Sequence, residues 1–149
     1  LSRLITVEVK KADGNANSPG VRSVIERARA INMPNENIER AVTRGKSKDT
    51  AALEEVVYEA YGPGGAALII HGFTDNKNRT GAEVKHLLSL SGAAFASQGA
   101  ASWAFRREGN TWVPQNTLPV SDTDAQKLRE LVEKLEENED VQEVFTNAE

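Results

Sequence analysis

The chain has 149 residues, of which 39% are hydrophobic and 27% charged, the balance of a globular protein with one ordinary domain or two small ones. It has no cysteine, which excludes disulfides, thiol catalysis and cysteine metal sites, and His71 and His86 are too far apart to predict a zinc site. We therefore expect no metal and no cofactor. No apolar stretch approaches a membrane span and no signal-peptide pattern occurs, which favours a cytoplasmic protein without a membrane partner.

The net charge of −4 is unevenly distributed along the chain. Residues 1–50 contain ten Lys or Arg and six Asp or Glu, whereas residues 51–149 contain eight and sixteen. Such asymmetry indicates a basic binding surface on the first half. The alternative is that both halves are simply solvated.

Residues 1–48 are predicted to form a basic bundle of three helices. Leu1 begins a helical apolar pattern, Ser18 and Pro19 provide an N-cap and a first helical residue, and a third helix follows Asn35 and is expected to end at Gly45. The apolar positions have helical spacing in each case: Leu4, Ile5 and Val9; Val21, Val24, Ile25 and Ala28; Ile38, Ala41 and Val42. Because the chain opens inside a helix, we expect a trimmed form of a longer protein.

Residues 49–149, after a polar linker at 46–50, are predicted to form an α+β domain. The pattern favours strands at 54–61, 66–74, 101–107, 111–120 and 141–145, and helices at 80–90 and 122–137. Residues 108–110 read as a hairpin turn, and Val141 and Phe145 are expected to face the core. We predict a ferredoxin-like sheet domain with its helices on one face.

Aromatic and histidine side chains in this domain are interpreted mainly as core. Trp103, Phe105 and Trp112 are expected to pack in the core or between strands, with base stacking as the alternative. His71, in an apolar strand, is expected to be a partnered core residue. Arg106 and Arg107 would then protrude at the hairpin and be able to touch a partner.

Two motifs flank the apolar strand at 66–73: Tyr61-Gly62-Pro63-Gly64-Gly65 and Asp75-Asn76-Lys77-Asn78-Arg79-Thr80. The glycines permit a tight turn, and the Asp and Asn side chains are typical of helix starts. With the segment at 140–145, these motifs resemble the YebC/PmpR family, which includes the mitochondrial translational activator of cytochrome oxidase. The resemblance implies a non-enzymatic, nucleic-acid-binding regulator of gene expression, whose relatives are linked to transcription and to translation on the ribosome.

Two departures from the family pattern are expected. Members usually carry a third domain inserted within the second, and a basic segment before the first helix. Here residues 103–107 pass almost directly to residues 112–115, which leaves no room for a domain. The resemblance therefore implies that the inserted domain is absent near 108–111, and that the extreme N-terminal segment is absent too.

The candidate nucleic-acid contacts fall into two groups. In the first half they are the basic residues Arg3, Lys10, Lys11, Arg22, Arg29, Arg40, Arg44, Lys46 and Lys48. In the second half they are Tyr61, Gly62, Gly64, Gly65, Asn76, Lys77, Asn78 and Arg79. Guanidinium groups suit phosphates, a tyrosine ring can stack on a base, and a helix N-terminus favours anions. The alternatives are an ordinary solvated surface, a simple β-turn and a capped helix start.

The function we predict is an RNA- or ribosome-associated translation factor of YebC type, with ribosomal RNA as partner. The alternative is a sequence-specific DNA-binding transcriptional regulator, although the helices show no strong helix-turn-helix pattern. An enzyme is disfavoured because the sequence lacks a nucleophile–base pair and a metal signature, so no small-molecule substrate is expected.

Overall fold

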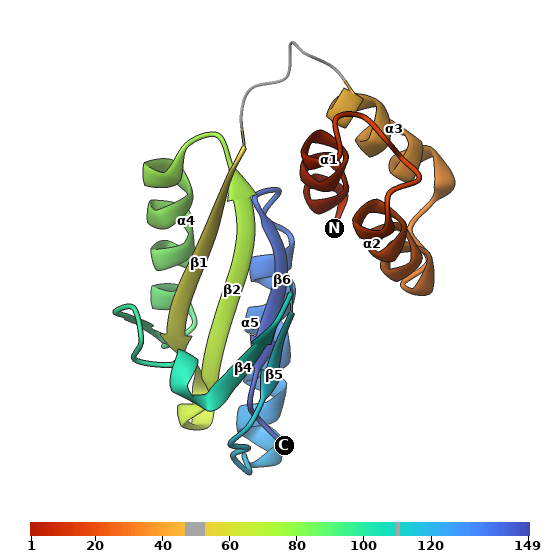
Figure 1. The fold of residues 1–149 in the computed structure, drawn as a ribbon. Coiled ribbons are helices and arrows are strands. Elements are labelled where there is room, and N and C mark those ends of the chain that lie inside the picture. Colours follow the sequence, from red (N-terminus) through yellow and green to blue (C-terminus); the bar gives the residue numbers. More distant parts are fainter. Residues whose placement is uncertain (47–52, 110) are drawn as a thin grey trace. The chain divides into compact units, whose positions relative to one another are not determined.

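The computed structural model describes residues 1–46, 53–109 and 111–149, which form two compact units, Leu1–Glu54 and Glu55–Glu149 (Figure 1). Residues 47–52, which include Lys48 and most of the predicted linker at 46–50, and Asn110 of the predicted hairpin turn lie outside the described residues. Within the described residues, no helix combines the length and the apolar character needed to cross a membrane.

The first unit is a bundle of three helices, α1 (Ser2–Lys11), α2 (Pro19–Ala30) and α3 (Asn35–Lys46). The predicted start of α2 is confirmed: Ser18 Oγ accepts a hydrogen bond from the Val21 amide at 3.4 Å, and Pro19 is the first helical residue. The apolar stripes meet in a buried core of Leu4, Ile5, Val9, Val21, Val24, Ala28, Ile38 and Ala41.

Gly45 does not end the third helix, so that prediction is wrong. It lies inside α3, which runs to Lys46, and it marks the contact between α3 and α1. A Cβ atom at Gly45 would lie 2.6 Å from Val9 Cβ and 2.8 Å from the carbonyl oxygen of Thr6. The Thr6 hydroxyl donates across the same contact to the carbonyl oxygen of Ala41 at 2.9 Å. Glycine is needed here because the two helix backbones approach closely.

The second unit is built on a four-stranded sheet in the order β3-β1-β2-β6. Its strands are β1 (Glu54–Tyr61), β2 (Ala67–Thr74), β3 (Ala94–Ala96) and β6 (Val141–Thr146), and the short β3 was not predicted. Helices α4 (Lys77–Leu90) and α5 (Asp122–Glu136) both pack on one face of this sheet. Their side chains form one core with β2: Leu68, Ile70, Val84, Leu88, Leu128, Leu131 and Leu135. The predicted α+β class, with a helical bundle before a sheet domain, is confirmed.

The opposite face of the sheet is covered by a hairpin of β4 (Phe105–Glu108) and β5 (Thr111–Pro114), shown in Figure 1. Both strands are shorter than predicted. Phe105 and Trp112 pack on Ala67 and Ile69 of β2, as expected of core aromatics. Trp103 is 58% exposed, so its predicted burial is wrong. Since both faces are covered, all eight residues of β2 are buried.

The last strand does not keep a strict two-residue alternation. The pairing of β2 with β6 shifts between His71 and Gly72, where Gly72 pairs with Val141 and leaves Gln142 as an extra residue. Val141 therefore packs with the helices whereas Phe145 packs with the hairpin, which corrects the prediction that both face one core. A Cβ atom at Gly72 would lie 2.2 Å from the carbonyl oxygen of Asp140, so the strands can meet here only at a glycine.

Candidate nucleic-acid interface

The first candidate surface is the outer side of α2, where Arg22 and Arg29 are both exposed. They are seven residues apart, close to two helical turns, and therefore lie on one face of the helix. Among the described residues neither arginine forms a salt bridge, so their charges are not neutralised within the part of the bundle that the structure describes. Arginines displayed in this way suit phosphate oxygens.

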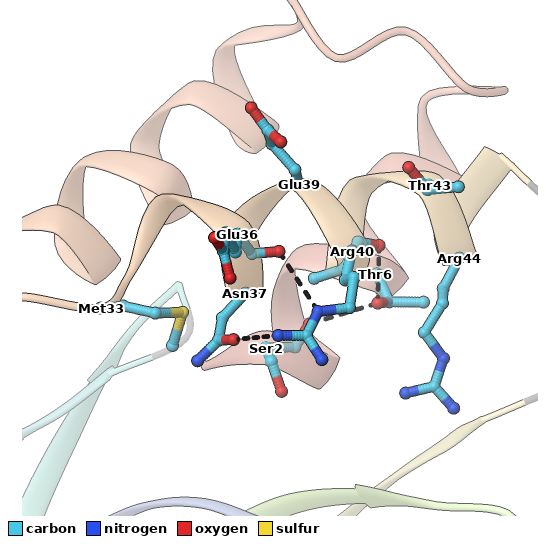
Figure 2. Close-up of a pocket in the computed structure, with 10 residues that line it drawn as sticks. Ser2, Thr6, Met33, Glu36, Asn37, Glu39, Arg40, Thr43 and Arg44 are labelled. Atoms are coloured by element: carbon cyan, nitrogen blue, oxygen red, sulfur yellow. Dashed lines mark hydrogen bonds between the residues drawn. The ribbon is translucent and has the colours of Figure 1, made fainter.

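The second candidate surface is a groove of about 700 Å³ formed by α3, the start of α1 and Met33 of the connection before α3 (Figure 2). Arg40 and Arg44 lie one turn apart on α3, and their guanidinium groups point to the same side of the helix, while Glu39 points away from them. Arg40 is held in place: Nη2 donates to Asn37 Oδ1 at 2.7 Å and Nε to the Glu36 carbonyl oxygen at 3.4 Å. The groove thus presents two neighbouring cations on one rim.

The remaining basic residues of the bundle are less uniform. Arg3 and Lys10 are half-buried, Lys46 is exposed, and Lys11 forms a salt bridge with Glu8 at 3.6 Å. The exposed arginines of α2 and α3 are therefore the strongest part of the predicted basic set.

The glycine motif forms a tight turn that packs against the start of α5. Gly64 and Gly65 have φ of 77° and 82°, a conformation that favours glycine. A Cβ atom at Gly64 would lie 3.0 Å from Val120 Cγ1 and 3.2 Å from Asp124 Oδ2. One at Gly62 would lie 3.2 Å from leucine side chains of β2 and α5. These contacts explain the motif by backbone reversal and packing, which is the structural alternative raised for it.

The Tyr61 side chain is half-buried and its hydroxyl is occupied at both ends. It donates to the carbonyl oxygen of Ala100 and accepts from Trp103 Nε1 at 3.1 Å. Trp103, which was predicted to be a core residue, is instead exposed at this end of the sheet, where Phe95 of β3 is also 40% exposed.

Glu59 holds the loop before Trp103 and was not predicted as a functional residue. Its carboxylate, 5% exposed, accepts backbone N–H groups from Gly99 at 2.7 Å, Ala101 at 2.9 Å and Ser102 at 2.6 Å. Burial alone would raise the pKa of Glu59, but the three N–H donors outweigh it and lower this pKa. The sequence could have indicated this role, because a glutamate at a core-facing position of a predicted strand needs hydrogen-bond partners.

The motif at 75–80 is the start of α4. Asn76 Oδ1 accepts from the Arg79 amide at 3.1 Å and is the N-cap. Arg79 Nη2 donates to Asp140 Oδ2 at 3.0 Å and to Asp75 Oδ1 at 2.9 Å, and Thr80 Oγ1 donates to the same Asp140 oxygen at 2.7 Å. The hydrogen bonds that Arg79 donates to Asp140 and Asp75 raise the pKa of its guanidinium above the ordinary value.

Arg79 therefore joins the start of α4 to the buried carboxylate that precedes β6. Asp140 is 3% exposed, so its charge needs these donors. Of the other predicted contacts in the motif, Lys77 and Asn78 are exposed at the helix N-terminus. The motif therefore starts and caps α4, as the alternative to nucleic-acid binding predicted, and Arg79 stabilises the fold by binding Asp140.

The two motifs do not come together in one site. The glycine turn precedes β2 and the Asp75–Thr80 motif follows it, so they lie at opposite ends of an eight-residue strand. At about 3.3 Å per residue this places them roughly 23 Å apart. Adjacency in the sequence therefore does not become adjacency in space.

A buried histidine fixes the hairpin to the sheet. His71 is 1% exposed and its Nε2 lies 3.0 Å from Glu55 Oε2, which confirms the predicted partnered core histidine. Burial lowers the pKa of His71 despite this carboxylate. Arg107 donates to both Glu55 oxygens at 3.1 and 3.2 Å and lies 4.5 Å from the centre of the Trp112 ring. Arg106 pairs with Glu108 at 2.5 Å, so both hairpin arginines have internal partners.

The described residues contain no group of three or more His, Asp or Glu side chains placed to hold a metal ion.

Comparison with known proteins identifies the family. The model for the second and third domain of TACO1/YebC proteins matches residues 53–111 and 108–148. The chain belongs to the TACO1/YebC family. The two matched stretches meet at 108–111, where the absence of an inserted domain is predicted.

Relatives in this family align over nearly the whole chain. A "probable transcriptional regulatory protein" of Thermotoga maritima is 33% identical over 100% of this chain and 83% of its own length. The protein of the same name from Petrotoga mobilis is 42% identical over 98% of this chain and 59% of its own. A crystal structure of the conserved hypothetical protein Aq1575 from Aquifex aeolicus has a TM-score of 0.80 and 28% identity, covering 99% of this chain and 87% of that one.

Proposed function

We propose that this TACO1/YebC protein is a non-enzymatic, nucleic-acid-binding regulator of gene expression that acts in translation by associating with RNA of the ribosome. The observation that carries the proposal is the pair of arginine surfaces of the bundle, one with Arg22 and Arg29 on α2 and one with Arg40 and Arg44 on α3. The relatives' name supports a regulatory role linked to nucleic acid. We place the protein in the cytoplasm, or in mitochondria for a eukaryotic source.

RNA is favoured over duplex DNA by the chemistry of the rim. Arg40 and Arg44 lie beside an open groove. Duplex DNA is usually read by a helix that enters its major groove and contacts the edges of paired bases, and a groove in the protein is not needed for that. The α3 surface provides phosphate binding next to a hollow, which suits irregular or unpaired RNA. Sequence-specific DNA binding, the activity that the relatives' name suggests, is the second candidate.

An enzymatic role is not part of the proposal. Besides Arg40, Arg44 and Asn37, the groove is lined by the carboxylates of Glu36 and Glu39, the hydroxyls of Ser2, Thr6 and Thr43, and the apolar Met33 and Ala41. The hydroxyl of Thr6 is hydrogen-bonded to backbone carbonyl oxygens, and among the described residues no hydrogen bond joins a hydroxyl of this groove to a base that could activate it. Its chemistry is that of binding.

The test is cosedimentation with ribosomes beside duplex-DNA binding across a salt series, for the wild-type chain and for Arg40→Glu/Arg44→Glu. Loss of two phosphate contacts should weaken ribosome binding at least about tenfold and reduce the slope of log affinity against log salt by about 1 per residue.

The matched control is Lys127→Glu/Arg129→Glu, which makes the same charge change at exposed positions of α5. This control should bind ribosomes nearly as well as the wild type. If both double variants lost ribosome affinity equally, the effect would come from the net charge of the protein and not from specific contacts by Arg40 and Arg44. Salt-resistant binding to duplex DNA without ribosome association would make the transcriptional role correct.

A further inference from the structure

The groove beside Arg40 and Arg44 is lined by different kinds of side chain at its two ends, and this suggests that it binds more than phosphate. Its C-terminal end carries the two arginines, whereas its N-terminal end is lined by Met33, Glu36 and Asn37. Arg40 follows Glu36 by one helical turn, about 6 Å along α3, and its guanidinium reaches back to Asn37 Oδ1 at 2.7 Å, so the two ends adjoin. One end therefore suits an anion and the other suits a flat, partly polar group.

The N-terminal end can contact a base in two ways. Asn37 Oδ1 is used by Arg40, and its NH₂ group has no hydrogen bond to another described residue, which leaves a donor at the groove. Glu36 provides a carboxylate acceptor of the kind that pairs with exocyclic amino groups of bases. The Met33 thioether is half-buried and gives a polarisable surface for an aromatic ring.

The polar group on the floor of the groove, the Thr6 hydroxyl, already has hydrogen-bond partners within the protein. The Thr6 hydroxyl has two carbonyl acceptors within reach, that of Ala41 at 2.9 Å and that of Ser2 at 3.2 Å, and Ala41 itself is 3% exposed. A ligand entering here would displace water from an already satisfied surface. A volume of about 700 Å³ lies within the range of small-molecule pockets.

We propose that this groove binds one unpaired nucleotide of a single strand, with its phosphates on Arg40 and Arg44 and its base between Met33, Glu36 and Asn37. The inference rests on the proposed nucleic-acid function and specifies it. A paired base cannot enter the groove, so the protein prefers single-stranded or looped RNA to duplex RNA of the same sequence.

The test is fluorescence anisotropy of the full chain with a labelled single-stranded RNA, the same strand in DNA, and the RNA duplex. Met33→Ala should weaken binding of the single strands roughly two- to tenfold, because a thioether–ring contact is lost, and should leave duplex binding unchanged. Ile31→Ala is the matched control, since Ile31 is an apolar residue of the same connection, 64% exposed and outside the groove lining.

A second variant guards against misfolding of the first. Ser2→Phe, at an exposed position on the α1 side, should fill the groove and reduce single-strand binding while the helical circular dichroism is retained. Glu36→Gln should reduce any preference for cytosine, adenine or guanine over uracil, because only the first three bases carry an exocyclic amino group that can donate to a carboxylate.

The outcomes separate the inference from the proposed function. Equal affinity for single strand and duplex, both lowered by Arg40→Glu/Arg44→Glu, would overturn the nucleotide site and keep nucleic-acid binding by the bundle. Insensitivity of all three nucleic acids to that double variant would overturn the proposed function as well. Loss confined to the single strands in both groove variants supports the site.

Discussion

At the scale of single residues, the most consequential side chain that sequence reasoning did not select is Glu59. Its carboxylate satisfies three backbone N–H groups of the loop that leads to Trp103. Glu59→Gln keeps a carbonyl acceptor but removes the charge and one oxygen. We expect it to lower the free energy of unfolding by about 1–3 kcal/mol at pH 7, measured by urea unfolding. Tryptophan fluorescence reports on this unit alone, because Trp103 and Trp112 both lie in it.

The pH dependence of this effect has a definite sign. The pKa of Glu59 is lower in the folded state, so its stabilisation is present above the ordinary carboxyl pKa of about 4.3 and is lost as the pH falls through the folded value. The difference between wild type and Glu59→Gln should therefore shrink below about pH 4.3. Glu133→Gln, at an exposed position of α5, is the control and should change stability little. A difference that grows on acidification would contradict this role of the carboxylate.

At the scale of elements, two glycines inside helices should respond oppositely to alanine. Gly45→Ala places a Cβ atom 2.6 Å from Val9 and should destabilise the bundle by about 1–3 kcal/mol, because α1 must move away from α3. At Gly81, in α4, the nearest atom to a new Cβ is the Tyr58 hydroxyl oxygen at 3.7 Å, an ordinary contact. Gly81→Ala should therefore stabilise the second unit by up to about 1 kcal/mol through helix propensity.

The two variants are read with different signals. Tryptophan fluorescence follows the second unit alone, whereas helical circular dichroism follows both units, because α4 and α5 also contribute to it. The unfolding of the bundle is therefore the part of the thermal transition seen by circular dichroism that tryptophan fluorescence does not show. A neutral Gly45→Ala would show that the helices separate easily, and would make the glycine a matter of propensity instead of packing.

The elements also show why some features could be predicted from the sequence and others could not. Ser18 and Pro19 mark the start of α2 because capping is local, and the apolar spacing of Val21, Val24 and Ala28 directly gives the buried side. A glycine after an apolar helical pattern is typical of a helix end, so Gly45 was predicted to end α3. Its actual role is to allow close contact with Val9, which lies far away in the sequence and cannot be found from local pattern. Trp103 and Trp112 look alike in sequence, and only the folding of the hairpin onto β2 buries one and exposes the other.

In the candidate site, too, features set by local sequence could be predicted, whereas features set by contacts between distant residues could not. Exposure of Arg22, Arg29, Arg40 and Arg44 could be anticipated from helical spacing. The salt bridge of Arg79 to Asp140 joins residues 61 positions apart, and the groove needs α1 and α3 together, so neither could be inferred from local pattern. The bulge at Gly72 shifts the pairing of β6 and likewise depends on a distant partner.

At the scale of the whole molecule, the basic bundle belongs to a chain of net charge −4. Nucleic acid approaching the arginines therefore also meets the repulsion of the acidic second half. Replacing Glu130, Glu133 and Glu137 with glutamine would change the net charge to −1 without touching the bundle. The rate of association with a single-stranded oligonucleotide should then rise at about 0.01 M salt, where the Debye length is about 30 Å.

The same difference should almost vanish at about 0.15 M salt, where charges are screened over about 8 Å. Arg40→Glu/Arg44→Glu should behave otherwise: contacts made directly with phosphates persist at that salt, so its loss of affinity should remain measurable. Stopped-flow association rates at the two salt concentrations distinguish the two kinds of electrostatic effect. If the glutamine variant still binds faster at 0.15 M salt, the acidic helix α5 must lie within a Debye length of the bound nucleic acid, and the interface would then extend beyond the bundle.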